Sequence, residues 1–269
     1  MVVEPLVAPV VDTHCHMDVE YDEQHILPSV NEALASARAV GVTKVIQVGC
    51  DVASSQWAAE TAGVYEDVWA AVALHPNAAA HDKQLDESLA QIERLAQLSS
   101  VRAIGETGLD YFRTGTELQH LQHESFRAHI EIAKSVNKPL VIHDRDAHED
   151  VVKTLLEVGP PDEVVFHCFS GDVELAAICA QHGWYTSFSG TVTFKNAQAL
   201  REAAALMPSD LLLVETDSPF LTPSPYRGRP NSSALIPLTV RALGAIRGES
   251  EEVICQALFS NSTRVFGPF

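Results

Sequence analysis

The sequence predicts an α/β fold, a (β/α)8 TIM barrel formed by a single domain over residues 1–269. Three observations predict this fold. Short β-branched runs alternate with helical patterns from end to end, so that eight strand–helix units follow one another. The strands are nearly continuous apolar runs, which is typical of a parallel sheet buried on both faces. No linker or change of composition interrupts the units, which favours a closed barrel over an open doubly wound sheet.

The first four strand–helix units occupy the first half of the chain. Their strands are predicted at Val10–Thr13, Lys44–Val48, Val68–Leu74 and Val101–Glu106. The helices that follow them are predicted at Ser29–Val40, Ala53–Val64, Leu85–Leu98 and Glu117–Val136. The strands are rich in β-branched and small apolar residues. Gly41 stands where the first helix is expected to end, a position that favours glycine.

The remaining four units complete the pattern. Their strands are predicted at Pro139–His143, Glu163–Cys168, Trp184–Phe188 and Leu211–Thr216. The helices that follow them are predicted at Ala147–Glu157, Val173–Gln181, Ala197–Leu206 and Ser233–Ile246. A last helix is expected at Glu251–Val265. The proline-rich stretch Pro219–Pro237 is expected to form a long loop after the eighth strand, and such loops often carry function.

Composition limits the classes of protein to which this chain can belong. It is 46% hydrophobic, and no apolar run approaches the ~20 residues that span a bilayer. Met1–Pro9 lacks the basic start of a secretory signal, and the five cysteines include no Cys-x-x-Cys pair. We therefore expect a soluble, cytoplasmic protein without a membrane partner. The net charge of −18 repels polyanions, whereas a protein that coats duplex DNA nonspecifically is normally basic. Nucleic-acid chemistry would therefore need local positive charge such as bound metal ions.

Unusual polar residues stand at the ends of the predicted strands. In strand order they are His14, His16, His75, Glu106, His143, His167 and Asp217. The carboxyl-terminal ends of the strands share one rim of a parallel barrel, and that rim holds the active site in essentially all enzymes of this fold. The other histidines fall in helices or polar loops, where we expect them to be solvated or loosely packed: His25, His81, His120, His123, His129, His148 and His182.

The first two of these residues are candidates for a pair of metal ligands, although alone they could equally be surface histidines at a strand end. Residues i and i+2 of a strand face the same side, so His14 and His16 should project together. Two neutral imidazoles directed at one point can bind a divalent metal. With Asp217 from the eighth strand, the pair could hold one ion.

The number of ligands indicates a second ion. His143 and His167 could hold it, and Glu106 lies on a strand from which it could bridge both ions. Imidazole with carboxylate suits zinc, manganese, nickel or iron, whereas magnesium prefers fewer nitrogens. Two ions ~3.5–4 Å apart activate a shared hydroxide and stabilise a leaving oxygen, which is the design of a hydrolase.

Five motifs follow one another along the chain and identify a family. They are His14-Cys15-His16, Gly105-Glu106-Thr107-Gly108-Leu109-Asp110-Tyr111, His143-Asp144-Arg145-Asp146-Ala147, His167-Cys168-Phe169-Ser170-Gly171 and Glu215-Thr216-Asp217-Ser218-Pro219. As a set they resemble the TatD family, metal-dependent deoxyribonucleases of the amidohydrolase superfamily. The resemblance runs from residue 11 to about residue 265. One departure affects the loop after strand eight, where the family commonly has Arg-Asn-x-Pro and this chain has Arg229-Pro230-Asn231-Ser232-Ser233.

The resemblance implies a ligand set and an activity. It places the first metal on His14, His16, Glu106 and Asp217, and the second on Glu106, His143 and His167. It also implies hydrolysis of DNA phosphodiesters supported by magnesium, manganese or zinc, often as a 3′→5′ exonuclease. The expected mechanism is attack of a metal-bound hydroxide on the phosphoester, with Asp217 and Glu106 as the catalytic residues. Asp217 would orient the nucleophile and accept its proton.

Four further residues are candidates for substrate contact. His75 and Arg145 would hold phosphate oxygens as charge develops, although Arg145 could equally form a surface salt bridge. Lys195 could add a phosphate contact or remain solvated. Tyr111 could stack on a base or pack into the core.

Alternatives to a deoxyribonuclease remain open in the sequence. A related barrel could hydrolyse an amide, a lactone or the ester of an aminoacyl-tRNA, although Glu106 stands where many such barrels carry a carboxylated lysine. In another class, the chain could be a metal-binding protein without catalysis. The expected partner is DNA or another phosphoester, and the expected state is a monomer or a weak oligomer.

Overall fold

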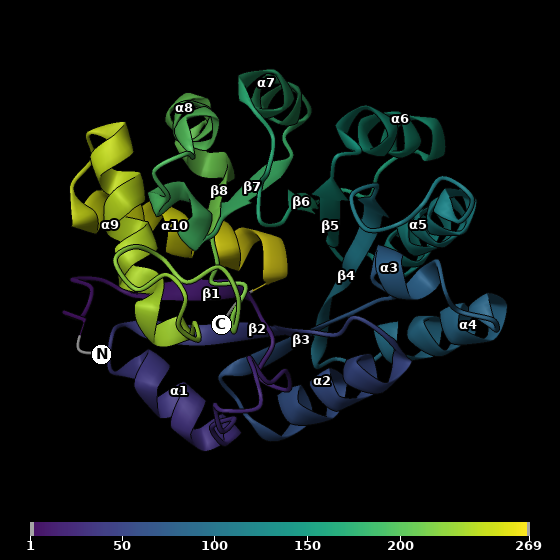
Figure 1. Ribbon diagram of the computed structural model, residues 1–269, viewed down its shortest axis with the longest axis horizontal. Coiled ribbons are helices and arrows are strands. Elements are labelled where there is room, and N and C mark those ends of the chain that lie inside the picture. The colour runs from purple at the N-terminus through teal and green to yellow at the C-terminus, as the bar shows by residue number, and fades with distance from the viewer. Residues whose placement is uncertain (1–2, 268–269) are drawn as a thin grey trace. The chain divides into compact units, whose positions relative to one another are not determined.

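A computed structural model describes residues 3–267, in which eight strands alternate with helices (Figure 1). The strands follow one another in the sheet in chain order. They are β1 (Val10–Cys15), β2 (Val42–Val48), β3 (Val68–Val72), β4 (Val101–Asp110), β5 (Leu140–Arg145), β6 (Val164–Phe166), β7 (Tyr185–Phe188) and β8 (Leu212–Val214).

The helices fall close to their predicted positions. They are α1 (Val30–Arg38), α2 (Val52–Val64), α3 (Pro76–Ala79), α4 (Leu85–Ala96), α5 (Gln119–Val136), α6 (His148–Val158), α7 (Val173–His182), α8 (Gln198–Leu206), α9 (Ile236–Arg247) and α10 (Glu251–Phe266). The short helix α3 was not predicted; Pro76 is its first residue, and the ring of His75 accepts a hydrogen bond from the backbone of Asn77. No helix within residues 3–267 is long and apolar enough to cross a membrane.

The chain divides into two compact units, which we describe separately. The first unit contains Met1–Ile46 and Gly171–Phe269, and the second contains Gln47–Ser170. The prediction of a single domain over residues 1–269 stays a prediction.

In the first unit the two ends of the strand series are joined. β7 and β8 pair in parallel register, with Ser187 opposite Leu213. The backbone of β1 then pairs with the segment that follows β8: Asp217 N donates to His14 O at 2.9 Å, and His16 N donates to Ser218 O at 2.8 Å. This pairing brings the ends of β1 and β8 side by side, as a closed barrel requires.

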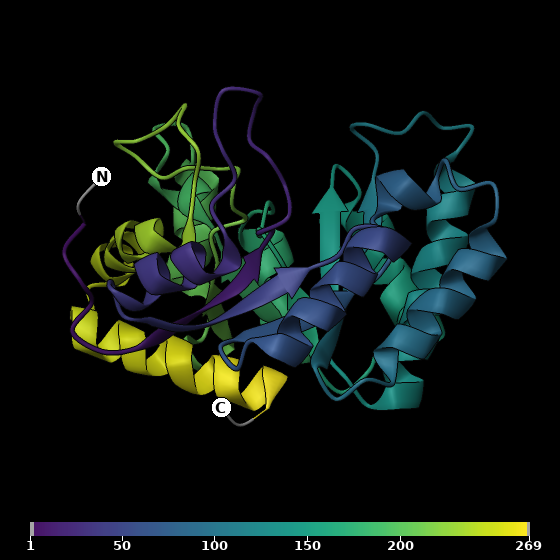
Figure 2. The same ribbon diagram turned by 90° about the horizontal axis from the view of Figure 1, so that it is seen from below.

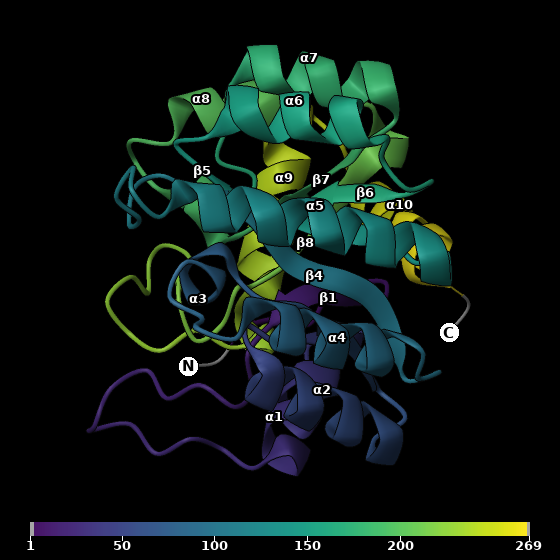
Figure 3. The same ribbon diagram turned by 90° about the vertical axis from the view of Figure 1, so that its right-hand side faces the viewer.

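In the second unit, β3 to β6 form a parallel array. β4 pairs with β3 and β5, and β6 pairs with β5. The helices α2, α4, α5 and α6 lie side by side along this array (Figure 3). Buried apolar residues of these helices, such as Ile92, Phe126 and Val151, shield the strands from water.

Local signals in the sequence explain where two of the helices begin. Ser29 caps α1, and its hydroxyl and the side chain of Glu32 satisfy one another's backbone amides. Asp51 and Ser54 do the same for α2. Such capping boxes provide acceptors for amides that have no partner within the helix.

Candidate metal centre

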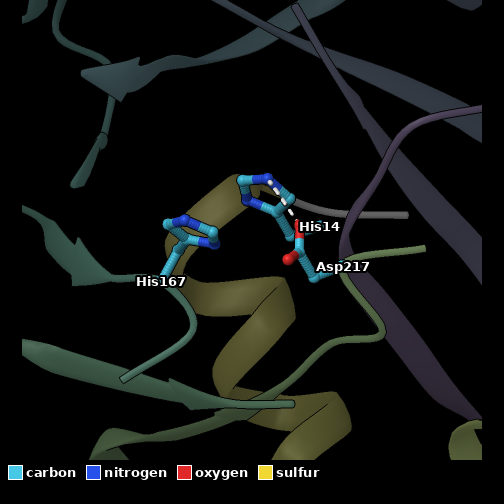
Figure 4. A group of neighbouring side chains, drawn as sticks. All are labelled: His14, His167 and Asp217. Atoms are coloured by element: carbon cyan, nitrogen blue, oxygen red, sulfur yellow. Dashed lines mark ion pairs between the residues drawn. The ribbon is translucent and has the colours of Figure 1, made fainter. Parts of the chain in front are cut away.

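The first unit brings together three of the predicted metal ligands. The Nε2 atoms of His14 and His16 are 3.2 Å apart. They lie 3.9 Å and 3.5 Å from Oδ1 of Asp217, and Figure 4 shows the contact between His14 and Asp217. Donors about 2.1 Å from a tetrahedral ion are about 3.4 Å apart, so these three separations fit one divalent ion.

Burial and backbone pairing hold these side chains in place. His14 is fully buried and His16 is 5% exposed, whereas 16% of the Asp217 side chain is exposed. Asp217 has a positive φ of 54° just after β8, and its amide is held by His14 O. The local turn and the strand pairing therefore set the direction of the carboxylate toward the two imidazoles.

Asp12 connects β1 to the chain on either side of Asp217. Its carboxylate accepts hydrogen bonds from the amide and the hydroxyl of Thr216, at 2.9 and 2.6 Å, and from the hydroxyl of Ser233 at 2.7 Å. Burial raises the pKa of Asp12 to about 6, although these hydrogen bonds act to lower it. The carboxylate thus ties the strand of His14 to the segment that carries Asp217.

In the second unit the carboxylate of Glu106 is surrounded by imidazoles. Its Oε2 atom lies 2.8 Å from His167 Nε2, 3.2 Å from His143 Nδ1 and 3.9 Å from His75 Nε2. Glu106 is 4% exposed. A buried carboxylate among nitrogen donors at these distances is a ligand set of the kind that binds divalent transition metals.

A bulge in β4 positions Glu106. Ile104 pairs with Leu140 and Thr107 pairs with Ile142, so Gly105 and Glu106 together face the single residue between them on β5. A bulge redirects the side chain at its position. A Cβ atom on Gly105 would lie 2.5 Å from Cβ of Val141, so only glycine fits there.

Gly108 allows β4 and β5 to approach closely beside the ligands. Its φ is +139°, and a Cβ atom there would lie 2.1 Å from the carbonyl oxygen of His143. Any other residue would have to displace the backbone of His143, one of the predicted ligands. Gly105 and Gly108 are therefore required because a side chain at either position would clash with β5.

Asp110 orients the ring of His143. Nε2 of His143 lies 3.3 Å from Oδ2 of Asp110, while Nδ1 faces Glu106. Burial acts to raise the pKa of Asp110, but hydrogen bonds from His143, Arg113 and Asn77 hold it well below its usual range. Burial also acts to lower the pKa of His143, and hydrogen bonds to Asp110 and Glu106 outweigh it and raise the pKa. A carboxylate on the far nitrogen of a ligating histidine fixes its tautomer and strengthens it as a ligand.

His75 is held in one tautomer. Its Nδ1 atom accepts a hydrogen bond from the amide of Asn77 at 3.1 Å, so the proton lies on Nε2. Burial lowers its pKa to about 4, although the charge of Glu106 acts to raise it, so the ring is neutral at pH 7. Nε2–H is therefore a hydrogen-bond donor.

The predicted substrate residues lie in different surroundings. The guanidinium of Arg145 stacks 3.9 Å from the ring centroid of Phe112, which is 62% exposed. The hydroxyl of Tyr111 lies 2.7 Å from both Asp150 Oδ2 and His123 Nε2, so it is engaged away from the Glu106 cluster. Lys195 is exposed in the first unit. Their roles in substrate binding stay predictions.

Two residues near these ligands were not assigned a role from the sequence. Asp110 follows Glu106 by four residues on the same strand face, so the period of two could have indicated it. The thiol of Cys50 donates a hydrogen bond to Glu106 Oε1 at 3.4 Å. Its place just after β2 puts it at a strand end, which is the signal that could have found it.

The expectation for the histidines outside the strand ends is wrong at one position. His129 was expected to be solvated or loosely packed, but it is fully buried in α5. Its Nδ1 atom lies 2.7 Å from Ser125 O, and its Nε2 atom accepts a hydrogen bond from the amide of Leu74 at 3.1 Å. The ring completes the hydrogen bonding at the end of β3, directly before His75, and this need arises only from tertiary packing.

Comparison with known proteins identifies the family. Residues 11–267 match the family model described as TatD related DNase. The chain belongs to this family. It is 42% identical over 261 residues to the uncharacterized metal-dependent hydrolase TatD of Mycobacterium tuberculosis, covering 96% of this chain and 97% of the relative. It is 38% identical over 257 residues to the uncharacterized metal-dependent hydrolase YabD of Bacillus subtilis, covering 95% and 98%.

Solved structures of the family confirm the fold. The crystal structure of YjjV, a TatD homologue from Escherichia coli, superposes with a TM-score of 0.87 at 28% identity, covering 96% of this chain and 97% of that one. The predicted (β/α)8 TIM barrel and the resemblance to the TatD family are therefore confirmed. The protein is a metal-dependent hydrolase of the TatD family.

Proposed function

We propose that this protein is a two-metal phosphodiesterase that hydrolyses DNA, degrading a strand from its 3′ end. The observation that carries the proposal is the carboxylate of Glu106, whose Oε2 atom lies within 3.2 Å of imidazole nitrogens of both His143 and His167. A carboxylate has two oxygens and can bridge two ions. The family description as TatD related DNase supports the choice of substrate.

The proposed ligand sets are those that the resemblance to the family implies. One ion would be bound by His14, His16, Glu106 and Asp217, and the other by Glu106, His143 and His167. The donors are nitrogen and carboxylate oxygen, which suit zinc, manganese or nickel, and magnesium with additional water. Divalent ions bound here would polarise a phosphoryl oxygen, provide a nucleophile at neutral pH and stabilise the leaving oxygen.

The protein's own groups would handle the proton and the phosphate. The Asp217 carboxylate is partly exposed beside His14 and His16, where it can orient a nucleophile and accept its proton. His75 would donate its Nε2–H to a phosphate oxygen, because its other nitrogen is already an acceptor. Arg145, preoriented by its stack on Phe112, would bind a second phosphate oxygen.

The test combines metal removal with one isosteric variant. Protein dialysed against chelator should lose hydrolysis of bis(4-nitrophenyl) phosphate and of a labelled single-stranded oligonucleotide, and recover both when metal is added. Asp217→Asn should lower the rate by about 10²–10⁴-fold, because a positioned proton acceptor contributes that much. Asp162→Asn, at an exposed aspartate, is the matched control and should retain full activity.

Other results would replace the proposal. Full hydrolysis by Asp217→Asn would overturn the role of Asp217. Turnover of an aminoacyl ester or an amide in preference to DNA would indicate one of the alternative hydrolases. Stoichiometric metal without turnover of any substrate would indicate a metal-binding role. Cytoplasmic location and a monomeric or weakly oligomeric state stay predictions.

A further inference from the structure

Two segments of the first unit carry positive charge in an otherwise acidic chain. Residues 183–201 and 218–248 contain six of the 18 lysines and arginines and none of the 36 acidic residues. They include the loops that follow β7 and β8. A polyanion bound to either segment would meet no carboxylate of that same segment.

Three of these six basic side chains serve the fold. Arg201 donates to the carbonyls of Val192 and Phe194, Arg241 pairs with Glu251, and Arg247 pairs with Glu249. The other three, Lys195, Arg227 and Arg229, are exposed. Within residues 3–267, none of these three forms an ion pair with a carboxylate. Their charges are available to a ligand.

The two loops are held against one another at this point. The guanidinium of Arg227 stacks 3.9 Å from the centroid of the Phe194 ring, and Ser224 N donates to Thr193 Oγ1 at 2.8 Å. A Cβ atom on Gly190 would lie 2.2 Å from Leu221 O, which shows how closely the backbones approach. Stacking preorients the planar guanidinium, so binding an anion costs less side-chain entropy.

The second of these loops starts and ends at the ligand Asp217. It leaves directly after Asp217, and Asn231 returns to it, donating its side-chain amide to the carbonyls of Thr216 and Phe220 at 2.9 and 2.7 Å. Asn231 is 6% exposed, so this closure is buried. Figure 2 shows the loop projecting from the same edge of the first unit as the loop between β1 and α1, which follows His16.

We propose that Phe194, Lys195, Arg227 and Arg229, which we call the basic strip, bind the phosphates and a base of single-stranded nucleic acid next to the hydrolysed bond. Arginine binds phosphate in a forked geometry, and an aromatic ring or a guanidinium plane can stack an unpaired base. Only an unpaired strand exposes its bases for such stacking. This inference rests on the proposed function and extends it, because it makes an oligonucleotide a better substrate than an isolated phosphodiester.

The experiment compares two double variants that remove the same charge. Arg227→Gln/Arg229→Gln alters the basic strip, and Lys83→Gln/Arg94→Gln alters two exposed residues of the second unit. Metal-loaded proteins are titrated into a fluorescent phosphorothioate oligonucleotide, which resists cleavage, over a series of salt concentrations. The rate on bis(4-nitrophenyl) phosphate, which has a single phosphate and no neighbouring nucleotide for the strip to bind, is measured in parallel.

The strip variant should bind the oligonucleotide about tenfold more weakly near 0.1 M salt. The magnitude of the slope of log affinity against log salt should fall by about 1.4, because each of the two lost phosphate contacts to a single strand contributes about 0.7. The control variant should match the unaltered protein, and all three should hydrolyse the small diester equally. Equal binding by the strip variant and the control would overturn the inference while leaving the proposed function intact.

Two further outcomes separate the strip from the catalytic proposal. If no protein hydrolyses the small diester or DNA, but the strip variant still loses oligonucleotide affinity, the proposed function fails and the strip stands. If vesicles rich in phosphatidylserine or a polyglutamate peptide bind to the strip more tightly than the oligonucleotide does, the inference of a nucleic-acid ligand is overturned.

Discussion

Replacing His129 with glutamine should remove a large pH dependence from the stability of this protein. Burial lowers the pKa of His129 to about 4, against an ordinary value of 6.5, although its hydrogen bond with Ser125 acts to raise it. In the unfolded chain His129 is therefore protonated below about pH 6.5, whereas in the folded chain it is protonated only below about pH 4. The contribution of the neutral His129 to the free energy of unfolding is fully present above pH 6.5 and is lost as the pH falls toward 4.

The size of the effect follows from the two pKa values. A difference of 2.5 pKa units corresponds to about 3 kcal/mol at low pH, of which about 2 kcal/mol is already lost at pH 5. Glutamine can accept the hydrogen bond from the amide of Leu74 but does not titrate. The His129→Gln protein should therefore not lose this part of its unfolding free energy at low pH.

Urea unfolding of the metal-free proteins at pH 7.5 and pH 5 measures the effect. The stability of His129→Gln relative to the unaltered protein should rise by about 2 kcal/mol between the two pH values. His120→Gln changes an exposed histidine of the same helix and should follow the unaltered protein. If His129→Gln also follows the unaltered protein, His129 is not held neutral by the fold and the reasoning is wrong.

Three further changes test the Glu106 cluster. Glu106→Gln keeps the shape of the side chain but removes its charge. The amount of metal bound per chain, measured by elemental analysis, should therefore fall together with activity. An unchanged metal content would contradict a ligand role for Glu106. Asp110→Asn should weaken metal binding about 10–100-fold in calorimetry, because Asp110 orients His143, and unchanged affinity would refute that. Gly108→Ala should lower the melting temperature and the metal content, since its Cβ would meet the His143 carbonyl at 2.1 Å. Gly63→Ala, in α2 with no atom within 4 Å, should be neutral or stabilising by up to about 1 kcal/mol; equal effects of the two would exclude the steric explanation.

The order of strands and the residues at their ends could be predicted from the sequence because both depend on local pattern. Apolar runs separated by helical periodicity define a parallel sheet without knowledge of any contact. His14 and His16 share a strand face by the period of two, and the structure places their Nε2 atoms 3.2 Å apart. Their pairing with Asp217 follows from the meeting of the first and last strands.

Element boundaries were less predictable where the backbone departs from regular geometry. β4 was expected to end at Glu106 but continues to Asp110, because a bulge and two glycines let it follow β5 further. β6 and β8 are shorter than expected, so His167 and Asp217 lie in the turns after them. The sequence pattern shows apolar residues, whereas hydrogen bonds between strands decide where a strand stops.

By itself the sequence determined the alternation of strands and helices, the set of histidines and carboxylates at the strand ends, and the family. Only the tertiary structure decided that His129 is a buried acceptor for Leu74, that Asp110 orients His143, and that Arg227 stacks on Phe194. These contacts join residues 33 to 55 positions apart in the chain, and no periodicity within one element can encode them. They depend on how closely packed elements satisfy buried polar groups and preorient charged ones, which is a property of the folded chain.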